Sequence, residues 1–246
     1  MEEFFRGVMI EESAIYTLWG TKPVTVIIID YYTDEEKDAF LNQMSEEELK
    51  TAVWSTDYCV GEKWEKWDKL RERFSINRYL LFKKPHSDPK LACLYFVDIL
   101  QLAATLQEHY ELFKRETGMD FDPIQVVLEM EKGSKFWNEV WDKSPSNTHL
   151  IGILFGFGLK NSFCYQWKWW PSVEFEKIAN TLKQKSSSGR SQGGDATIDH
   201  LLIPSFASFF NEDEVIEQYN REREKIKKIY KGHDFLDVTL RKLTES

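Results

Sequence analysis

The chain has 246 residues, a formal net charge of −9, an apolar fraction of 42% and a charged fraction of 30%. The negative charge argues against nucleic acid as a main partner, because binding to a phosphate backbone needs clustered Lys and Arg side chains. A chain of this length buries roughly 70–75% of its unfolded surface, so its fold requires neither a disulfide nor a structural metal.

The N-terminal part of the chain predicts a β-hairpin. Residues 14–32 hold two runs rich in Ile, Val, Tyr and Thr, separated by the turn residues Gly20–Pro23. Thr33 is then predicted to cap a helix that begins with acidic residues, and Ser45 with Glu48 has the spacing of a capping box for the next helix.

The middle of the chain predicts a helix, a second hairpin and more helices. Residues 62–74 place apolar side chains at helical spacing. Residues 77–84 and 90–97 form two extended runs around a loop with two prolines. A long helix is expected over 98–117, with Gly118 as its C-terminal cap. Further helices are predicted to start at Asp122–Pro123 and at Ser134.

Residues 149–165, HLIGILFGFGLKNSFCY, form the most distinctive segment. We interpret it as a buried helix that ends near Gly158. Its glycines, Gly152, Gly156 and Gly158, indicate a place where backbones approach closely or turn sharply. Their order and flanks do not fit a dinucleotide-binding or P-loop motif, which favours helix packing.

The C-terminal part predicts two more helices around a connector. A helix is expected after Pro171, and the Ser- and Gly-rich residues 186–196 are typical of a mobile loop. Residues 201–210 are apolar and contain a proline, which predicts an edge strand or a buried connector. Asn211 is expected to cap a long helix, and a short helix is expected after Asp234.

Four residues near the glycine segment are candidate ligand contacts. They are His149, Lys160, Asn161 and Ser162. The turn over residues 157–162 is interpreted either as part of helix packing or as the rim of a pocket, with Lys160 and Asn161 as polar contacts. His149 is interpreted either as a buried or helix-terminal residue or as a group presented to a cleft.

The second candidate cluster is aromatic. Aromatic residues make up 15% of the chain, and nine of its residues are Trp. Large rings fill a core efficiently, but they also line grooves for a sugar, a base or a peptide. Trp167, Trp169 and Trp170 lie within four positions. They are interpreted either as an anchor on the core or as an exposed patch for a partner.

No catalytic or metal-binding motif is recognised. The five histidines are dispersed, with no pair at the spacing of a metal site, so neither a metal nor another cofactor is predicted. Ser205 does not sit in the motif of a hydrolase nucleophile. The three cysteines are far apart, and no disulfide framework is expected.

No targeting or spanning segment is recognised either. The first residues lack the pattern of a secretory signal. The longest apolar run has about ten residues, half of what a membrane-spanning helix needs. No membrane span is therefore expected, and the compartment stays open.

Two segments carry a resemblance. Gly20–Pro23 and residues 149–158, followed by Asn161, resemble uncharacterised conserved proteins of chlamydia-like and other host-associated bacteria. The resemblance covers about twenty residues. It implies a bacterial origin, and no residue takes a role from it.

The sequence predicts an α+β fold in which hairpins form a small antiparallel sheet packed against about eight helices. Residues 1–210 are expected to form one domain, and residues 211–246 a helical arm packed on it. Without a catalytic constellation, a non-enzymatic binding or protein-interaction domain is the first functional hypothesis, for a protein or small-molecule partner. An enzyme with a pocket near residues 149–162 is the second, and a homo-oligomer joined through residues 211–246 is the third.

Overall fold

The computed structural model describes residues 1–45, 60–142, 146–170, 176–187 and 197–245. These residues form 13 α-helices, a three-stranded antiparallel sheet and a two-stranded sheet. The predicted helix-rich α+β fold with a small antiparallel sheet is confirmed, and the described helices outnumber the eight or so that the sequence indicated.

The larger sheet has the strand order β1-β3-β2, and both pairings are antiparallel. Its strands are β1 (Val24–Asp30), β2 (Tyr79–Pro85) and β3 (Leu91–Asp98). Strands β2 and β3 form the predicted second hairpin, with Tyr79 opposite Asp98. The first predicted hairpin is wrong, because β1 pairs with β3 instead.

The segment expected to precede β1 as a strand is a short helix, α2 (Ile15–Trp19). Four successive residues from Ile15 to Leu18 are buried. A half-buried strand would alternate buried and exposed positions, whereas a short helix inside the core buries neighbouring residues together. Apolar runs this short do not distinguish the two structures.

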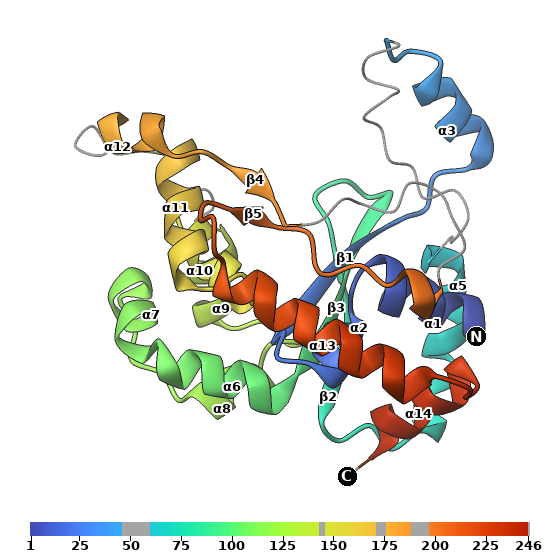
Figure 1. Ribbon diagram of the computed structural model, residues 1–246. Helices are drawn as coiled ribbons and strands as arrows, with labels where there is room; N and C mark the ends of the chain where they lie inside the picture. Colours follow the sequence, from blue (N-terminus) through green and yellow to red (C-terminus); the bar gives the residue numbers. More distant parts are fainter. Residues whose placement is uncertain (46–59, 143–145, 171–175, 188–196, 246) are drawn as a thin grey trace.

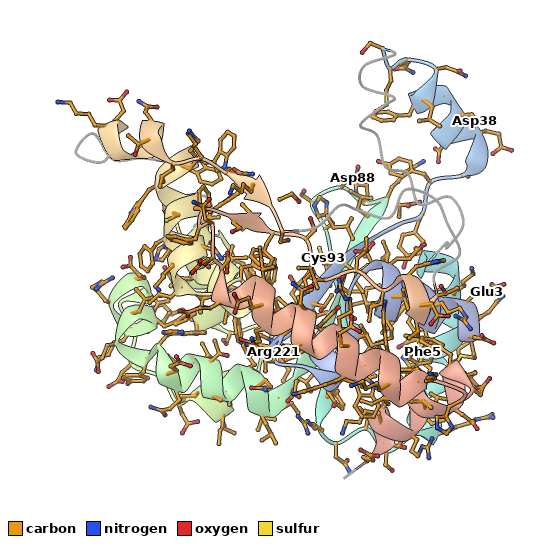
Figure 2. The ribbon with its side chains drawn as sticks, viewed as in Figure 1. Glu3, Phe5, Asp38, Asp88, Cys93 and Arg221 are labelled. Carbon is orange, nitrogen blue, oxygen red and sulfur yellow. The ribbon has the colours of Figure 1, made fainter. Side chains whose placement is uncertain are left out.

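One face of the sheet carries the first hydrophobic core. Successive strand residues point to opposite faces, and Ile27, Leu94 and Phe96 lie on this side. The covering elements include a π-helical turn, Gly7–Glu11. The helices are α1 (Glu2–Arg6), α2, α5 (Val60–Asp68), α13 (Glu214–Tyr230) and α14 (Phe235–Thr244). Figure 1 shows α13 running across the sheet, and Figure 2 shows Phe5 in this core and Arg221 on the outer side of α13.

The opposite face carries a second core. Val24, Phe82 and Val97 point to this side, so the sheet lies between two helical layers. The helices packed here are α6 (Ile99–Glu108), α7 (Tyr110–Thr117), α8 (Pro123–Leu128), α9 (Lys135–Asp142) and α10 (Thr148–Leu154).

The long helix predicted over 98–117 is two helices. His109, with φ −107° and ψ 23°, separates α6 from α7. The break lets α7 turn toward α9, where the rings of Phe113 and Phe136 are 6.2 Å apart. The predicted ends are confirmed: the Asp98 side chain caps α6, and Gly118 ends α7 with φ 70°.

Most predicted helix starts are confirmed. Thr33 and Glu36 form a capping box on α3 (Asp34–Leu41), and Asp122 caps α8 with Pro123 in its first turn. Asp234 caps α14. The cap of α13 is Asp213 rather than Asn211, since the Asp213 carboxylate accepts bonds from two amides of the first turn.

Other predicted elements are shorter or fall outside the described part. The helix expected over 62–74 ends at Asp68 and is followed by a 3₁₀ turn, Arg71–Arg73. The helix predicted after Pro171 is described as α12 (Glu176–Thr181). The capping box of Ser45 with Glu48 and most of the 186–196 loop lie outside the described residues.

Large aromatic side chains fill much of the two cores. Trp64, Trp67 and Trp137 are 0–2% exposed, which confirms the packing interpretation for these three rings. Residues 211–245 contribute to the first core as well, through Tyr219 and Ile226 of α13 and Phe235 of α14. The division into one domain of residues 1–210 and a helical arm of residues 211–246 stays a prediction.

Candidate functional site

The glycine segment forms a tight junction between two helices. The buried helix α10 ends at Leu154, earlier than predicted, and α11 (Leu159–Trp169) follows after a short turn. A Cβ at position 152 would lie 2.6 Å from Ser162 Oγ, so only glycine lets α10 and α11 approach this closely. Gly156 and Gly158 have φ values of 75° and 77°. The close approach and sharp turn predicted from these glycines are both present.

The turn is fixed against two distant parts of the chain. Tyr219 of α13 donates a hydrogen bond from its hydroxyl to the Gly156 carbonyl oxygen at 2.9 Å. A Cβ at position 156 would lie 2.5 Å from Tyr219 Oη and 3.2 Å from Pro23 Cδ. The Gly20–Pro23 segment and the glycine turn are therefore neighbours in the fold.

A pocket of about 410 Å³ opens beside this junction. It lies between α10, α11 and a two-stranded ribbon of β4 (Lys185–Ser186) and β5 (Ala207–Ser208). On α10, positions 148, 151, 152 and 155 share one helix face and form one wall. The apolar lining residues are Ile151, Phe155, Phe157, Phe206 and Ala207, with Gly152 at the helix junction. The polar ones are Thr148, Asn161, Ser162, Tyr165, Gln184, Ser186 and Ser205.

Among the described residues that line the pocket, none has a charged side chain, although 30% of the chain is charged. A charged ligand group placed here would lose its hydration without gaining an ionic partner from the lining, which is costly. The described lining is therefore better suited to an uncharged group than to a charged one.

Three polar groups of the lining are available to a ligand. Among the described residues, the Tyr165 hydroxyl, the Ser205 hydroxyl and the Gln184 amide nitrogen form no hydrogen bond. A ligand that supplies complementary donors and acceptors would pair these groups.

Exposed aromatic rings stand at the edge of the pocket. Trp169 and Trp170 are 54% and 42% exposed. Their rings lie 6.4 Å and 6.1 Å from the ring of Tyr165, which lines the pocket. Trp169 Nε1 donates to Gln184 Oε1 at 3.2 Å and so orients another lining residue. We refer to Tyr165, Trp169 and Trp170 as the aromatic rim.

Trp167 differs from its two neighbours. It is half-buried, and its ring packs against Phe163 at 5.8 Å. Of the three predicted tryptophans, the structure places two beside the pocket and directs the third to helix packing.

Asn161 and Ser162, two of the candidate contacts, both line the pocket, and their role as ligand contacts stays a prediction. Their polar atoms already have structural roles. Asn161 Nδ2 donates to the Phe157 carbonyl at 3.1 Å and to Asp213 Oδ2 at 2.9 Å. The Ser162 hydroxyl donates to the Gly158 carbonyl at 2.7 Å. Lys160 is exposed and does not line the pocket.

His149 lies away from the pocket lining, 4% exposed, with its ring 4.7 Å from that of Phe163. Burial lowers the pKa of its imidazole, and Glu116 and Gln166 oppose this shift. Both ring nitrogens lack a hydrogen-bond partner, and so does the nearby Gln166 Oε1. His149 is a neutral buried ring rather than a group presented to the cleft.

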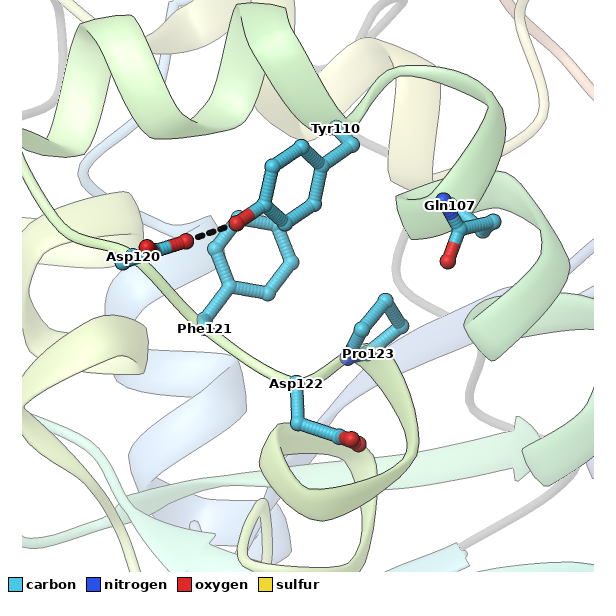
Figure 3. Close-up of a pocket in the computed structure, with 6 residues that line it drawn as sticks. All are labelled: Gln107, Tyr110, Asp120, Phe121, Asp122 and Pro123. Carbon is cyan, nitrogen blue, oxygen red and sulfur yellow. Dashed lines mark hydrogen bonds between the residues drawn. The ribbon is translucent and has the colours of Figure 1, made fainter.

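A second hollow lies between α7 and α8. Figure 3 shows Tyr110, Phe121 and two carboxylates around it. Asp120 accepts a hydrogen bond from the Tyr110 hydroxyl and is 3.4 Å from Lys114 Nζ. Asp122 caps α8. Because both carboxylates are already engaged in the fold, this open hollow is the weaker candidate site.

In the part of the chain that the structure describes, no three His, Cys, Asp or Glu side chains come together to hold a metal ion. No described helix is both long and apolar enough to cross a membrane.

Comparisons with protein-family models, with curated proteins and with solved structures found no significant match to this chain. The resemblance of the two glycine-containing segments to bacterial proteins therefore stays a prediction.

Sequence reasoning found one side of the pocket and missed the other. Gln184, Ser186 and Ser205 carry no pattern that indicates a site, and they join the pocket only because the β4–β5 ribbon folds back onto α10 and α11.

Proposed function

We propose that this chain is a non-enzymatic binding protein whose pocket takes a small uncharged ligand. The observation that carries the proposal is the described lining, which combines apolar walls with unpaired neutral polar groups and in which no described residue is charged. A volume of about 410 Å³ lies within the range of small-molecule sites.

The composition of the lining favours binding over catalysis. General acid–base work uses His, Asp, Glu, Lys, Cys or Tyr groups placed at the reacting atoms. Among the described lining residues, Tyr165 is the one of these types, and none of the others is a base that could act beside it. His149, the group that the enzyme hypothesis needed, lies outside the lining.

The aromatic rim supports the same proposal. Exposed tryptophans next to a cavity are typical of recognition surfaces, where large rings supply contact area with few rotatable bonds. Trp169 is exposed to solvent, and its indole nitrogen donates a hydrogen bond to Gln184 of the pocket lining.

A thermal-shift screen of neutral and charged small molecules tests the proposal. We expect neutral compounds to raise the melting temperature, since a ligand at 100 times its Kd adds about 2.7 kcal/mol of stability. Ser205→Trp, which places a large ring in the lining, should abolish the shift. The control Ile124→Ala changes an exposed residue of α8 and should leave the shift unchanged. Stabilisation by charged compounds alone, or an equal shift in Ser205→Trp, would contradict the proposal.

A further inference from the structure

We infer that the ligand of the pocket is a neutral saccharide, an inference that rests on the proposed binding function. The first argument is the orientation of the aromatic rim. The planes of Trp169 and Trp170 are inclined by 53° and 54° to the plane of Tyr165. A flat base is held best by parallel stacked rings. Inclined rings instead offer separate faces, which suit the puckered C–H faces of sugar rings.

The second argument is the hydrogen-bonding chemistry. The unpaired groups of the lining are two hydroxyls, on Tyr165 and Ser205, and the amide nitrogen of Gln184. Each hydroxyl both donates and accepts, as the hydroxyls of a sugar do, and the amide donates. A polyhydroxylated ring therefore satisfies all three groups at once.

The third argument separates a saccharide from a peptide. A peptide that adds to a sheet pairs with free backbone groups at a strand edge. Near the pocket, the Phe206 amide donates to Ser187 Oγ at 2.8 Å, and the Phe206 carbonyl accepts from the Ser187 amide at 3.0 Å. Residues 184, 186 and 205–207, in the ribbon or next to it, line the pocket. Because the Phe206 backbone groups are already paired within the ribbon, a ligand there meets mainly side chains.

The neutral side chains of the described lining narrow the class of saccharide further. Sugar phosphates, uronic acids and nucleotides would bring a charge that no described lining residue pairs. The predicted ligands are uncharged mono- and disaccharides.

The test is a titration of the protein with saccharides, in which tryptophan fluorescence and the melting temperature report binding. The probes are glucose, galactose, N-acetylglucosamine, maltose and cellobiose, each at up to about 100-fold above a millimolar Kd. Adenosine and a tripeptide blocked at both ends serve as neutral probes of the other two classes. We expect at least one saccharide to saturate the site, and the other two probes to have no effect.

Variants connect the signal to the pocket. Trp169→Ala should weaken saccharide binding about ten-fold, the effect of losing one stacking face. Ser205→Ala removes a hydroxyl that has no hydrogen-bond partner among the described residues, so it tests the site even if Trp169→Ala is poorly folded. Ile124→Ala is the matched control, with an exposed apolar residue outside the pocket, and should bind as the unchanged chain does.

The outcomes distinguish the two proposals. Saturation by adenosine or the blocked tripeptide, sensitive to Ser205→Trp, would overturn the saccharide inference and keep the binding function. No response to any neutral probe would overturn both.

Discussion

Asn161 lines the pocket, but its side chain also forms hydrogen bonds that hold three parts of the fold together. Its amide nitrogen bridges the Phe157 carbonyl and the Asp213 carboxylate, while Asp213 also accepts from the Ser208 hydroxyl at 2.6 Å. This buried network joins α11, β5 and the start of α13. Because removing one partner leaves other buried polar atoms unpaired, changes at Asn161 act on stability as well as on the pocket.

His149 gives a pH-dependent prediction at the residue scale. Its buried ring has a lowered pKa, so the unfolded chain takes up a proton more readily than the folded chain does. The contribution of neutral His149 to the free energy of unfolding is therefore fully present above the pKa of the unfolded chain, about 6.5. It is lost as the pH falls from there toward the lower pKa of the folded chain. His149→Phe keeps an aromatic ring beside Phe163 and removes the titration. We expect its advantage in melting temperature over the unchanged chain to grow from about pH 7 to about pH 5.

The control for this measurement is His233→Gln, at an exposed histidine after α13. A pH-dependent difference that also appears in His233→Gln would not be due to the buried ring. Parallel pH profiles for His149→Phe and the unchanged chain would show that the buried ring does not limit stability in acid.

At the scale of elements, the turn between α10 and α11 depends on backbone conformations that other residues adopt at a cost. Gly156 and Gly133 have nearly the same φ, 75° and 76°, but only Gly156 has atoms within 4 Å of an added Cβ. Gly133→Ala should cost about 1–2 kcal/mol for the left-handed conformation alone. Gly156→Ala adds overlap with Tyr219 and Pro23, for a total of about 2–5 kcal/mol.

Urea unfolding of the two glycine variants measures this difference directly. Equal losses of stability in the two variants would mean that Pro23 and Tyr219 do not restrict the space at position 156. A larger loss in Gly156→Ala, with an unchanged slope against urea, supports the three-way junction.

Local signals predicted the element ends well and the pairing of elements poorly. Asp98, Asp122 and Asp234 cap helices at the places where the sequence predicted helices to begin, because a side chain bonding to the next turn is a local interaction. Tyr16 lies in a segment expected to be a strand. It belongs instead to the helix α2, which packs against β3 and α13, and these contacts are distant in sequence. The same difference between local and distant contacts applies to the pocket. Gly152 lies in a segment that the sequence singled out, whereas Ser205 joins the lining only through contacts distant in sequence.

At the scale of the whole molecule, the C-terminal helices α13 and α14 supply part of the first hydrophobic core. Ile226 of α13 and Phe235, Val238 and Leu243 of α14 are at most 5% exposed. Burying four such side chains contributes roughly 6–12 kcal/mol, which is comparable to the total stability of a domain, about 5–15 kcal/mol. Tyr219 and Asp213 also hold the glycine turn and α11 from this side.

Deletion of residues 211–246 should therefore abolish cooperative unfolding rather than release a folded monomer. Circular dichroism melting and size-exclusion chromatography of the shortened chain distinguish the two results. A shortened chain that melts cooperatively and elutes at a smaller size than an oligomeric full chain would instead support subunit contact through these helices. Loss of the melting transition, with the full chain well folded, would place α13 and α14 within the folding unit that forms the pocket.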